Sequence, residues 1–268
     1  MSYNMNEVVA QSDLLFITLD TLRYDVAQAA WEAGALPNFS DWLPSTGWEQ
    51  RHSPGSFTYA AHHAFFAGFL PTPVSPGKHP RLFATAFAGS ETAVEQTCIL
   101  QAPTIMEGLA AKGITTACVG GVGFFNKQTP LSKVFPSLFQ HSYWSPELGV
   151  TNPHSTQAQL EQAVQVLGEH PEPTFLFVNI SAIHQPNYFY LEQAVASNKQ
   201  DTIESHAAAL RYVDQQLPIL QAALARRARP TFIICCADHG TTYGEDGYTG
   251  HRIAHEQVWT VPYLETLV

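Results

Sequence analysis

The chain has 268 residues, of which 45% are hydrophobic and only 13% are charged. A hydrophobic share of this size supports a packed core and excludes wholesale disorder. The 13 Lys and Arg residues against 23 Asp and Glu residues leave a net charge of −10. This deficit of positive charge argues against a protein that binds nucleic-acid polymers, because such a protein needs a basic face.

The sequence carries no recognisable targeting signal. Its amino-terminal residues lack a basic region followed by an apolar stretch, so no signal peptide is expected. No apolar run approaches the roughly 18 residues of a membrane-spanning helix. The four cysteines include no C-x-x-C pair and predict reduced, buried thiols rather than a disulfide framework: Cys98, Cys118, Cys235 and Cys236. These features predict a cytoplasmic protein without a membrane partner.

Short apolar, β-branched runs alternate with helical patterns along the chain. In chain order they predict a strand at 14–19, a helix from about 21, helices at 59–68 and 104–111, a strand at 114–119, a helix from 155, a strand at 174–180, a helix at 203–227, and strands at 232–237 and 261–264. A proline-rich stretch at 71–90 predicts a surface loop. No linker or repeat divides the chain, so one domain spanning residues 1–268 is expected. The alternation favours an α/β fold, a three-layer α/β/α sandwich with a mostly parallel central sheet.

Three of the predicted strands lead into side chains suited to metal binding or catalysis. Asp20 follows the first strand, His184 follows the strand at 174–180, and the pair Asp238-His239 follows the strand at 232–237. Ligands of open α/β sheets bind beyond the carboxyl ends of the strands, so these residues are expected at one edge. A single Asp after a strand often only caps the next helix. Three such endings together indicate a metal site.

The residue types narrow the choice of metal. Carboxylate and imidazole ligands together favour zinc, manganese or iron over an all-oxygen calcium site. Further along the chain, His251 and His255 are four residues apart, which is one turn if their segment is helical. Each of them could instead be a buried, hydrogen-bonded histidine, and for His255 this is the simpler interpretation.

The segment at 53–68 offers a candidate nucleophile. Its apolar spacing predicts a helix over 59–68, with Thr58 or Ser56 at the start. A hydroxyl at this position is ordinarily an N-cap. However, the N–H groups at a helix start also favour the anionic oxygens of a phosphoester, and a metal ion can lower the pKa of the hydroxyl. His62 lies one turn further on the same face, where it would orient the hydroxyl or simply pack.

These motifs together resemble the alkaline-phosphatase and sulfatase superfamily, in its sulfatase-like branch. Residues 15–25 are similar to that branch's opening motif I-x-I-D-T-L-R-x-D. The segment from Thr58 is similar to its nucleophile helix, with His four residues on, Gly ten residues on and then Leu-Pro. Residues 175–186 resemble F-x-F-x-N…H-x-P, and residues 238–262 resemble D-H-G…G-E-H-G…G-H…E…V-P. The likeness covers nearly the whole chain, in order.

The resemblance implies a site and a reaction. Asp20, Asp238 and His239 would hold a divalent cation, with zinc or manganese expected. Thr58 would bind the same ion and attack phosphorus, forming a phospho-threonine that water hydrolyses. His184 and His251 would face the substrate and stabilise its leaving or non-bridging oxygens, with His251 a further metal ligand. The implied activity is a metal-dependent hydrolase of small-molecule phosphate or phosphonate esters, a phosphodiesterase or phosphomonoesterase.

Two departures from the family pattern restrict this expectation. Sulfatases convert a Cys or Ser of a C/S-x-P-x-R motif to formylglycine, and Thr58 cannot be converted, so sulfate-ester hydrolysis is not expected. Two-metal relatives place an Asp four residues before the histidine, and here that position is Ile180, with Asn179 the nearest polar residue. One metal ion is therefore expected, and a second only if His184 or His255 assembles its site differently.

Other functions remain open from the sequence. A phosphotransferase or phosphomutase could use the same covalent intermediate. A catalytically degenerate relative could bind a phosphorylated ligand or partner without turnover. A dinucleotide-binding loop at 120–126 is a weaker alternative because Asn126 replaces the last glycine of its motif. Lys78, Arg81 and Lys127 could contact an anionic group, although solvated surface charge is the simpler interpretation.

Overall fold

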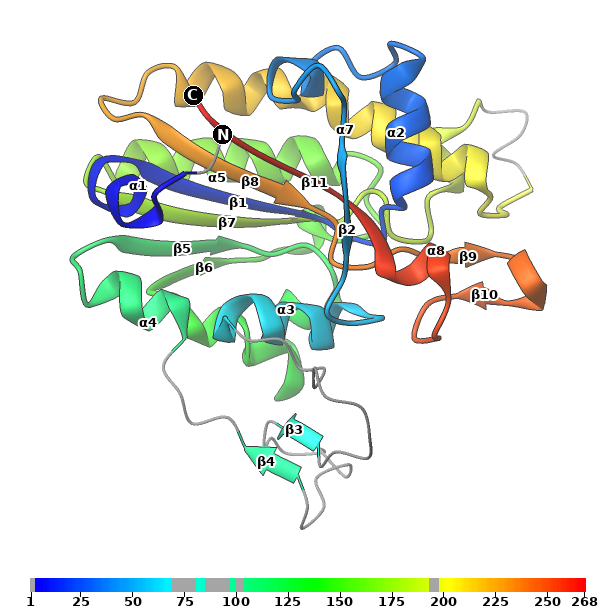
Figure 1. The fold of residues 1–268 in the computed structure, drawn as a ribbon, viewed down its shortest axis with the longest axis horizontal. Coiled ribbons are helices and arrows are strands. Elements are labelled where there is room, and N and C mark those ends of the chain that lie inside the picture. The colour runs from blue at the N-terminus through cyan, green and yellow to red at the C-terminus, as the bar shows by residue number, and fades with distance from the viewer. Residues whose placement is uncertain (1–2, 69–80, 85–96, 100–103, 193–197) are drawn as a thin grey trace.

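A seven-stranded sheet forms the centre of the computed structural model, which describes residues 3–68, 81–84, 97–99, 104–192 and 198–268 (Figure 1). The strand order is β2-β11-β8-β1-β7-β5-β6. Its members are β1 (Asp13–Leu19), β2 (Glu49–His52), β5 (Thr115–Val119), β6 (His141–Tyr143), β7 (Thr174–Ile180), β8 (Thr231–Cys236) and β11 (Thr260–Leu267). Two small sheets pair β3 (Arg81–Ala84) with β4 (Thr97–Ile99) and β9 (Thr242–Tyr243) with β10 (Thr249–Gly250).

The central strand β1 lies between two parallel neighbours, β7 and β8. Leu19 is level with Ile180 of β7, and Thr18 is level with Cys236 of β8. The carboxyl ends of the three strands therefore meet at one edge of the sheet. The strand β11 runs antiparallel to both β8 and β2, so the sheet is mostly but not wholly parallel.

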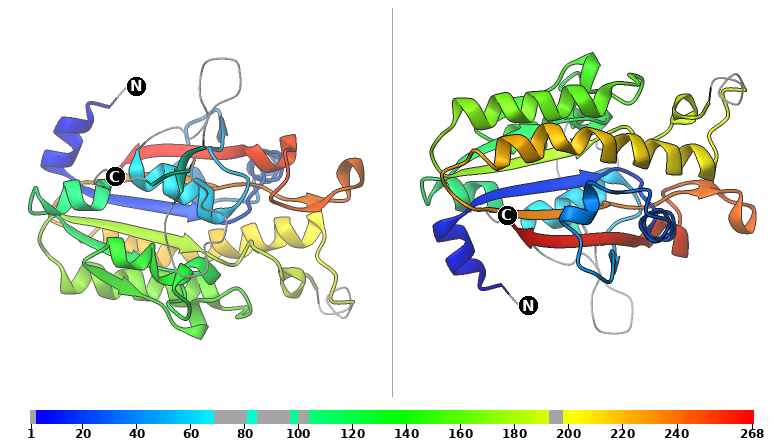
Figure 2. Two further views of the ribbon diagram at one scale, coloured as in Figure 1. Left: turned by 90° about the horizontal axis from the view of Figure 1, so that it is seen from below. Right: turned by 90° about the horizontal axis from the view of Figure 1, so that it is seen from above.

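Helices cover both faces of this sheet (Figures 1 and 2). One face packs against α2 (Tyr24–Glu32), α5 (Ser155–Glu169) and α7 (Ile203–Leu224), and the other faces α1 (Met5–Gln11), α3 (Thr58–Ala67) and α4 (Ile105–Ala110). Alternate residues of β1 serve the two layers: Leu15 and Ile17 join the first core, and Leu14 joins the second. This arrangement confirms the predicted three-layer α/β/α sandwich.

Short connections complete the chain. Within the described residues, the remaining α-helix is α8 (Glu256–Trp259), and the single-turn 3₁₀ helices are Phe39–Asp41, Gly123–Phe125, Leu131–Lys133, Pro136–Leu138, Pro146–Leu148, Tyr188–Tyr190 and Glu245–Gly247. None of the helices in the described part of the chain is long and apolar enough to cross a bilayer.

The predicted elements are found, with shifts at their ends. The helix expected from about residue 21 begins at Tyr24, because Thr21 adopts a left-handed backbone conformation with φ 65° that no helix accommodates. The helix at 203–227 ends at Leu224 and contains Pro218. The strand at 261–264 is longer than predicted, since β11 spans eight residues. Most of the proline-rich stretch at 71–90 lies outside the described residues.

Candidate functional site

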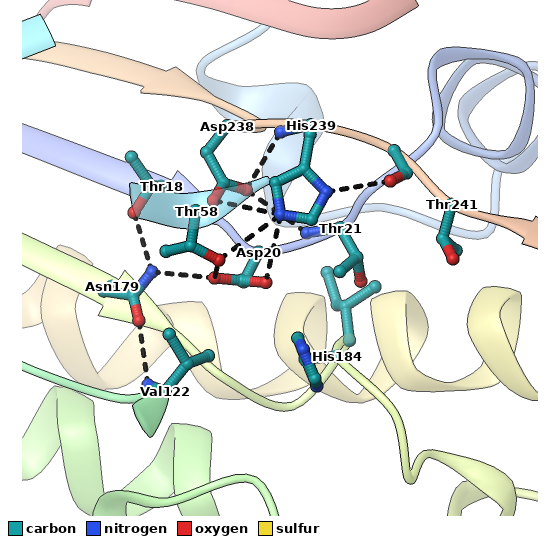
Figure 3. A network of polar contacts seen from close by, with 12 residues as sticks. Thr18, Asp20, Thr21, Thr58, Val122, Asn179, His184, Asp238, His239 and Thr241 are labelled. Carbon is teal, nitrogen blue, oxygen red and sulfur yellow. Dashed lines mark hydrogen bonds and ion pairs between the residues drawn. The ribbon is translucent and has the colours of Figure 1, made fainter. Parts of the chain in front are cut away.

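Asp20, Asp238 and His239 meet at the carboxyl edge of the sheet (Figure 3). Asp20 follows β1 directly, and the other two follow β8 after Ala237. All three are fully buried, and one ligand atom from each lies within 4.8 Å of the others. The Nε2 atom of His239 is 3.5 Å from Oδ2 of Asp238 and 3.9 Å from Oδ1 of Asp20. The adjacent strand ends thus gather two carboxylates and one imidazole around one point.

Each of the two carboxylates keeps one oxygen without a hydrogen-bond partner among the described residues, Oδ1 of Asp20 and Oδ2 of Asp238. The other oxygen of Asp238 accepts from the backbone N–H groups of Thr21 and His239 at 3.3 and 3.0 Å. Burial, and then the charge of Asp238, raises the pKa of Asp20 to about 6, and burial raises the pKa of Asp238 to about 7. Unpaired buried carboxylates are costly, and a divalent cation between them removes this cost.

The imidazole of His239 is oriented as a metal ligand. Its Nδ1 lies 2.8 Å from the carbonyl oxygen of Gly240, which can only accept, so Nδ1 carries the proton and Nε2 is bare. Burial lowers the pKa of His239 and keeps the ring neutral. A hydrogen bond from the second ring nitrogen is the usual support of a metal-bound histidine. The two orphaned oxygens and this nitrogen fit zinc or manganese.

The same geometry predicts an unusual stability effect for Asp238→Asn. The amide keeps the accepting oxygen and places an N–H group toward the bare Nε2 of His239, so the metal-free variant should melt a few degrees above the metal-free wild type at alkaline pH. Since folding raises the pKa of Asp238, the folded wild type loses stability as the pH rises from about 3.8 through about 7. The difference between the two proteins should therefore shrink on acidification. Thermal melts across this pH range after chelation test it, and a lower melting temperature of the variant at alkaline pH contradicts it.

Thr58 is the first residue of α3 and lies beside the three ligands. Its Oγ1 is 3.3 Å from Oδ2 of Asp20 and 3.3 Å from Nε2 of His239. The N-cap position of α3 belongs to Phe57, so the interpretation of Thr58 as a helix cap is wrong. The hydroxyl is directed at the three-ligand cluster instead of at the backbone of its own helix.

A buried polar network around Asn179 of β7 connects the cluster to neighbouring strands and loops (Figure 3). Asn179 of β7 donates to Oδ2 of Asp20 at 3.4 Å and to Oγ1 of Thr18 at 3.1 Å, and it accepts from the N–H of Val122 at 3.0 Å. His62 lies 2.7 Å from the carbonyl oxygen of Thr58 through Nδ1 and 3.2 Å from Thr18 through Nε2. Both ring nitrogens of His62 are therefore engaged by Thr18 and by the Thr58 carbonyl, so His62 anchors the first turn of α3.

A pocket of about 330 Å³ opens onto Thr58, and its wall includes His184, His251 and Arg252. The ring of His251 is 4.6 Å from that of His239 and 5.7 Å from that of His184 between centroids. The Nδ1 atom of His251 is buried without a partner among the described residues, and burial lowers the pKa of this residue to about 3. The structure thus brings both histidines expected to face a substrate to the mouth of the cluster.

The structure does not bring His255 to the cluster. Its Nδ1 accepts from the N–H of Gln257 as the N-cap of α8, and its Nε2 is 3.2 Å from the carboxylate of Asp246. The segment between Gly250 and α8 is not helical, so the assumed one-turn spacing from His251 does not exist.

The basic residues considered from the sequence lie elsewhere or are not described. The ammonium of Lys127 donates to the carbonyl oxygen of Ser142. Lys78 and the side chain of Arg81 lie outside the described residues. Arg252, which sequence reasoning did not single out, is the arginine that reaches the pocket. Its position directly after His251 in the sequence could have indicated that it lies at the same pocket.

Glycines at two positions allow the backbone to pack closely around the cluster. A Cβ on Gly121 would lie 2.2 Å from the carbonyl oxygen of Asn179, which gives the glycine-rich loop at 120–126 a packing role against β7. A Cβ on Gly240 would lie 2.0 Å from the carbonyl oxygen of Gln257. The glycine of the D-H-G motif is therefore required where this loop passes α8.

We predict that Gly240→Ala destabilises the protein by about 3 kcal/mol. The added methyl group would overlap the carbonyl oxygen of Gln257, which belongs to the backbone of α8. Gly168 in α5 is the matched control, since a Cβ there meets nothing within 4 Å and alanine favours a helix. Gly168→Ala should leave stability unchanged or raise it slightly. Urea denaturation of both variants tests this pair, and equal midpoints would contradict it.

A larger groove of about 530 Å³ is lined by residues of α1, α3, α4 and the sheet, and it shares no lining residue with the pocket at Thr58. Apolar side chains such as Phe16, Phe65 and Ile234 dominate its lining. Neither Thr58 nor any of the three ligands contributes to it. The grouping of metal-ligating and hydroxyl side chains, and not the volume of a cavity, therefore marks the candidate functional site.

The family model named Sulfatase matches residues 12–265, and the chain therefore belongs to the Sulfatase family. Among curated proteins, none matches this chain. Members of the wider superfamily act on phosphate or sulfate esters and depend on divalent metal ions. The resemblance inferred from the motifs is confirmed.

Solved structures share the fold at low sequence identity. The C-terminal periplasmic domain of the phosphoethanolamine transferase EptC from Campylobacter jejuni is 13% identical, with a TM-score of 0.64 over 96% of this chain and 79% of that one. The corresponding EptC domain from Escherichia coli, in complex with zinc, is 12% identical, with a TM-score of 0.65 over 95% and 72%. The lipoteichoic acid synthase LtaP from Listeria monocytogenes is 13% identical, with a TM-score of 0.64 over 98% and 68%.

These comparisons correct one expectation. The prediction of a cytoplasmic location is wrong, because the two similar transferase structures are periplasmic domains. That prediction rested on the amino-terminal residues of the sequence, which lack the pattern of a signal peptide, and on the number and spacing of the cysteines.

Proposed function

We propose that this protein is a metal-dependent enzyme that moves the phosphoryl group of a phosphate or phosphonate ester to Thr58 and then to water. The observation that carries the proposal is the position of the Thr58 hydroxyl, 3.3 Å from both Asp20 and His239 of the three-ligand cluster. Asp20, Asp238 and His239 would hold the ion. When bound, a divalent ion neutralises charge on the phosphoryl oxygens and lowers the pKa of a nearby hydroxyl.

The first half of the reaction uses residues already in contact. Oγ1 of Thr58 forms a bond to phosphorus while the ester P–O bond breaks. The hydroxyl proton has an acceptor in Oδ2 of Asp20, to which Oγ1 already donates. The departing alkoxide takes up one proton and leaves as an alcohol, and the enzyme holds a phosphorylated Thr58.

His184 is the candidate donor of that proton. Its Nδ1 is 2.6 Å from the carbonyl oxygen of Gln185 and therefore carries a hydrogen, so Nε2 is the atom that gains and releases a proton. In the second half, water attacks phosphorus and gives a proton to Nε2 of His184, the bond from phosphorus to Thr58 breaks, and Oγ1 takes back the proton held by Oδ2 of Asp20. The products are the alcohol and phosphate, or the alcohol and a phosphonic acid or phosphate monoester where the substrate carries a second group on phosphorus.

Phosphorus esters are proposed instead of sulfate esters because of the nucleophile. The sulfatase reaction of this family uses formylglycine, which arises from Cys or Ser, and Thr58 offers neither. The complete set of Asp20, Thr58, Asp238 and His239 also favours turnover over mere binding of a phosphorylated ligand. Each of these four side chains is buried and directed at one point.

Transfer to an alcohol is the second candidate, and the comparisons favour it specifically. Similar structures include phosphoethanolamine transferases and a lipoteichoic acid synthase. The same phospho-threonine would serve, with an alcohol oxygen replacing water in the second step. His184, the proposed acceptor of the proton from water, would accept the proton of an alcohol in the same way.

A product ratio distinguishes the two candidates. The purified protein, reconstituted with zinc or manganese, is incubated with a panel of para-nitrophenyl phosphate and phosphonate esters, with and without a simple alcohol acceptor. A hydrolase releases para-nitrophenol and the phosphorus acid in equal amounts even when the alcohol is present. A transferase releases more para-nitrophenol than phosphorus acid and forms the new ester. Absence of turnover across the panel, in protein shown to contain metal, would overturn the proposal.

A further inference from the structure

Arg252 occupies a distinctive position at the pocket that opens onto Thr58. Among the described residues that line this pocket, it is the side chain with a permanent charge. The other polar members of the wall are hydroxyl and amide groups and the imidazoles of His184 and His251, and burial lowers the pKa of His251 to about 3. With a divalent ion bound by Asp20, Asp238 and His239, a substrate in this pocket would meet two separate positive charges, the ion and the guanidinium of Arg252.

The backbone around Arg252 ties the residue to the nucleophile loop. Its N–H donates to the carbonyl oxygen of Ser56 at 2.8 Å, two residues before Thr58. Its φ of 70° lies in the left-handed region, which costs a side-chain-bearing residue about 1 kcal/mol. Its guanidinium lies over the ring of Phe57, with Cζ 5.6 Å from the ring centroid. These contacts hold the guanidinium near Thr58 without neutralising it.

Among the described residues, no carboxylate forms an ion pair with Arg252. The arginine ion pairs in the described part of the chain involve Arg23, Arg51, Arg227 and Arg229. Arg252 is exposed and forms none. An unpaired, positioned cation on the wall of a site for phosphorus esters is suited to bind a negative charge on the ligand.

We propose that Arg252 determines substrate specificity by binding a second negative charge on the substrate, in addition to the charge that the ion site receives. The inference rests on the proposed function and deepens it. A singly charged phosphodiester engages one of the two cationic points. A doubly charged substrate engages both, whether its second charge is on phosphorus, as in a phosphate monoester, or on the organic group.

Matched substrates test this inference in the metal-loaded protein. Para-nitrophenyl phosphate carries a second charge on phosphorus, its methyl ester does not, and its carboxyethyl ester carries the second charge on the organic group. Arg252→Gln should lower kcat/KM by about 10- to 100-fold for at least one doubly charged substrate and by less than about 3-fold for the methyl ester. The substrate that loses rate identifies the position of the second charge. Arg252→Lys should restore part of the loss.

Arg211→Gln is the control, since Arg211 is an exposed arginine of α7 outside the pocket. It should leave all three rates unchanged. Equal losses for the three esters in Arg252→Gln would mean that the residue only maintains the loop, and no loss for any would mean that it does not contact the substrate. Either result overturns the inference.

A binding measurement separates this inference from the proposed function. Calorimetry of the metal-loaded Thr58→Ala variant compares inorganic phosphate as a dianion, carboxyethyl methyl phosphate and singly charged dimethyl phosphate. Adding Arg252→Gln should weaken binding of at least one doubly charged ligand by about tenfold and leave dimethyl phosphate unaffected. This result stands even if the protein turns over no ester. Equal affinities with and without Arg252 overturn the inference.

Discussion

Thr58→Ala should lower the turnover of a phosphate ester by at least about a thousandfold, while the protein retains its metal ion. The substitution removes the oxygen that would form the bond to phosphorus. It leaves Asp20, Asp238 and His239 in place, and its own backbone carbonyl still accepts from His62. The loss should therefore fall on kcat rather than on folding or metal content.

Thr58→Ser is the matched control because it restores a hydroxyl at the same atom. It should recover activity to within about one or two orders of magnitude of the wild type. Initial rates with a para-nitrophenyl ester, measured beside metal content and a thermal melt, make this comparison. Full activity in Thr58→Ala with normal metal content would remove Thr58 from the reaction.

The second large effect concerns the three metal ligands. The double variant Asp238→Ala, His239→Ala should contain no zinc, manganese or iron after brief dialysis, whereas the wild type should contain near-stoichiometric metal. A ligand that binds only the folded state stabilises it by about 4 kcal/mol at a thousandfold excess over its Kd. Restoring the ion to chelated wild type should therefore raise its melting temperature by about 10 °C, with no shift in the double variant.

His255→Ala provides the control for the metal measurement. His255 is bonded to Gln257 and Asp246 and lies outside the three-ligand cluster. This variant should keep the wild-type metal content and the wild-type thermal shift. Plasma mass spectrometry gives the metal content directly. Loss of metal in His255→Ala, or its retention in the double variant, would place the ion elsewhere.

The sequence carried enough information to predict the layers of the fold. Strands β1, β7 and β8 are short apolar runs buried on both faces, and helices alternate with them. Parallel pairing of these strands also predicted that Asp20 and Asp238 lie close together, because each residue follows the carboxyl end of one of two adjacent strands. The rule that ligands bind beyond the carboxyl edge was enough to group these ligands, whereas Thr58 starts a helix and was placed with them only by the family resemblance.

Other features depended on tertiary packing that no local pattern encodes. The antiparallel direction of β11 follows from the path through α8 and not from its apolar composition. The left-handed conformation of Thr21 is supported by its N–H bond to Asp238, more than 200 residues away. The bonds of Asn179 to Asp20 and Val122 likewise join distant segments. For His255, the simpler interpretation as a hydrogen-bonded histidine is confirmed, since the segment before it is not helical.

The covalent intermediate tests the central claim most directly. The metal-loaded protein is mixed with excess para-nitrophenyl ester, quenched in acid within the first turnovers and digested for peptide mass spectrometry. The account predicts a mass gain of one phosphoryl group on the peptide that contains Thr58, located on Thr58 by fragmentation. This gain should be absent after chelation and in Thr58→Ala. Turnover with the label on another residue, or a label that survives in Thr58→Ala, would contradict the account.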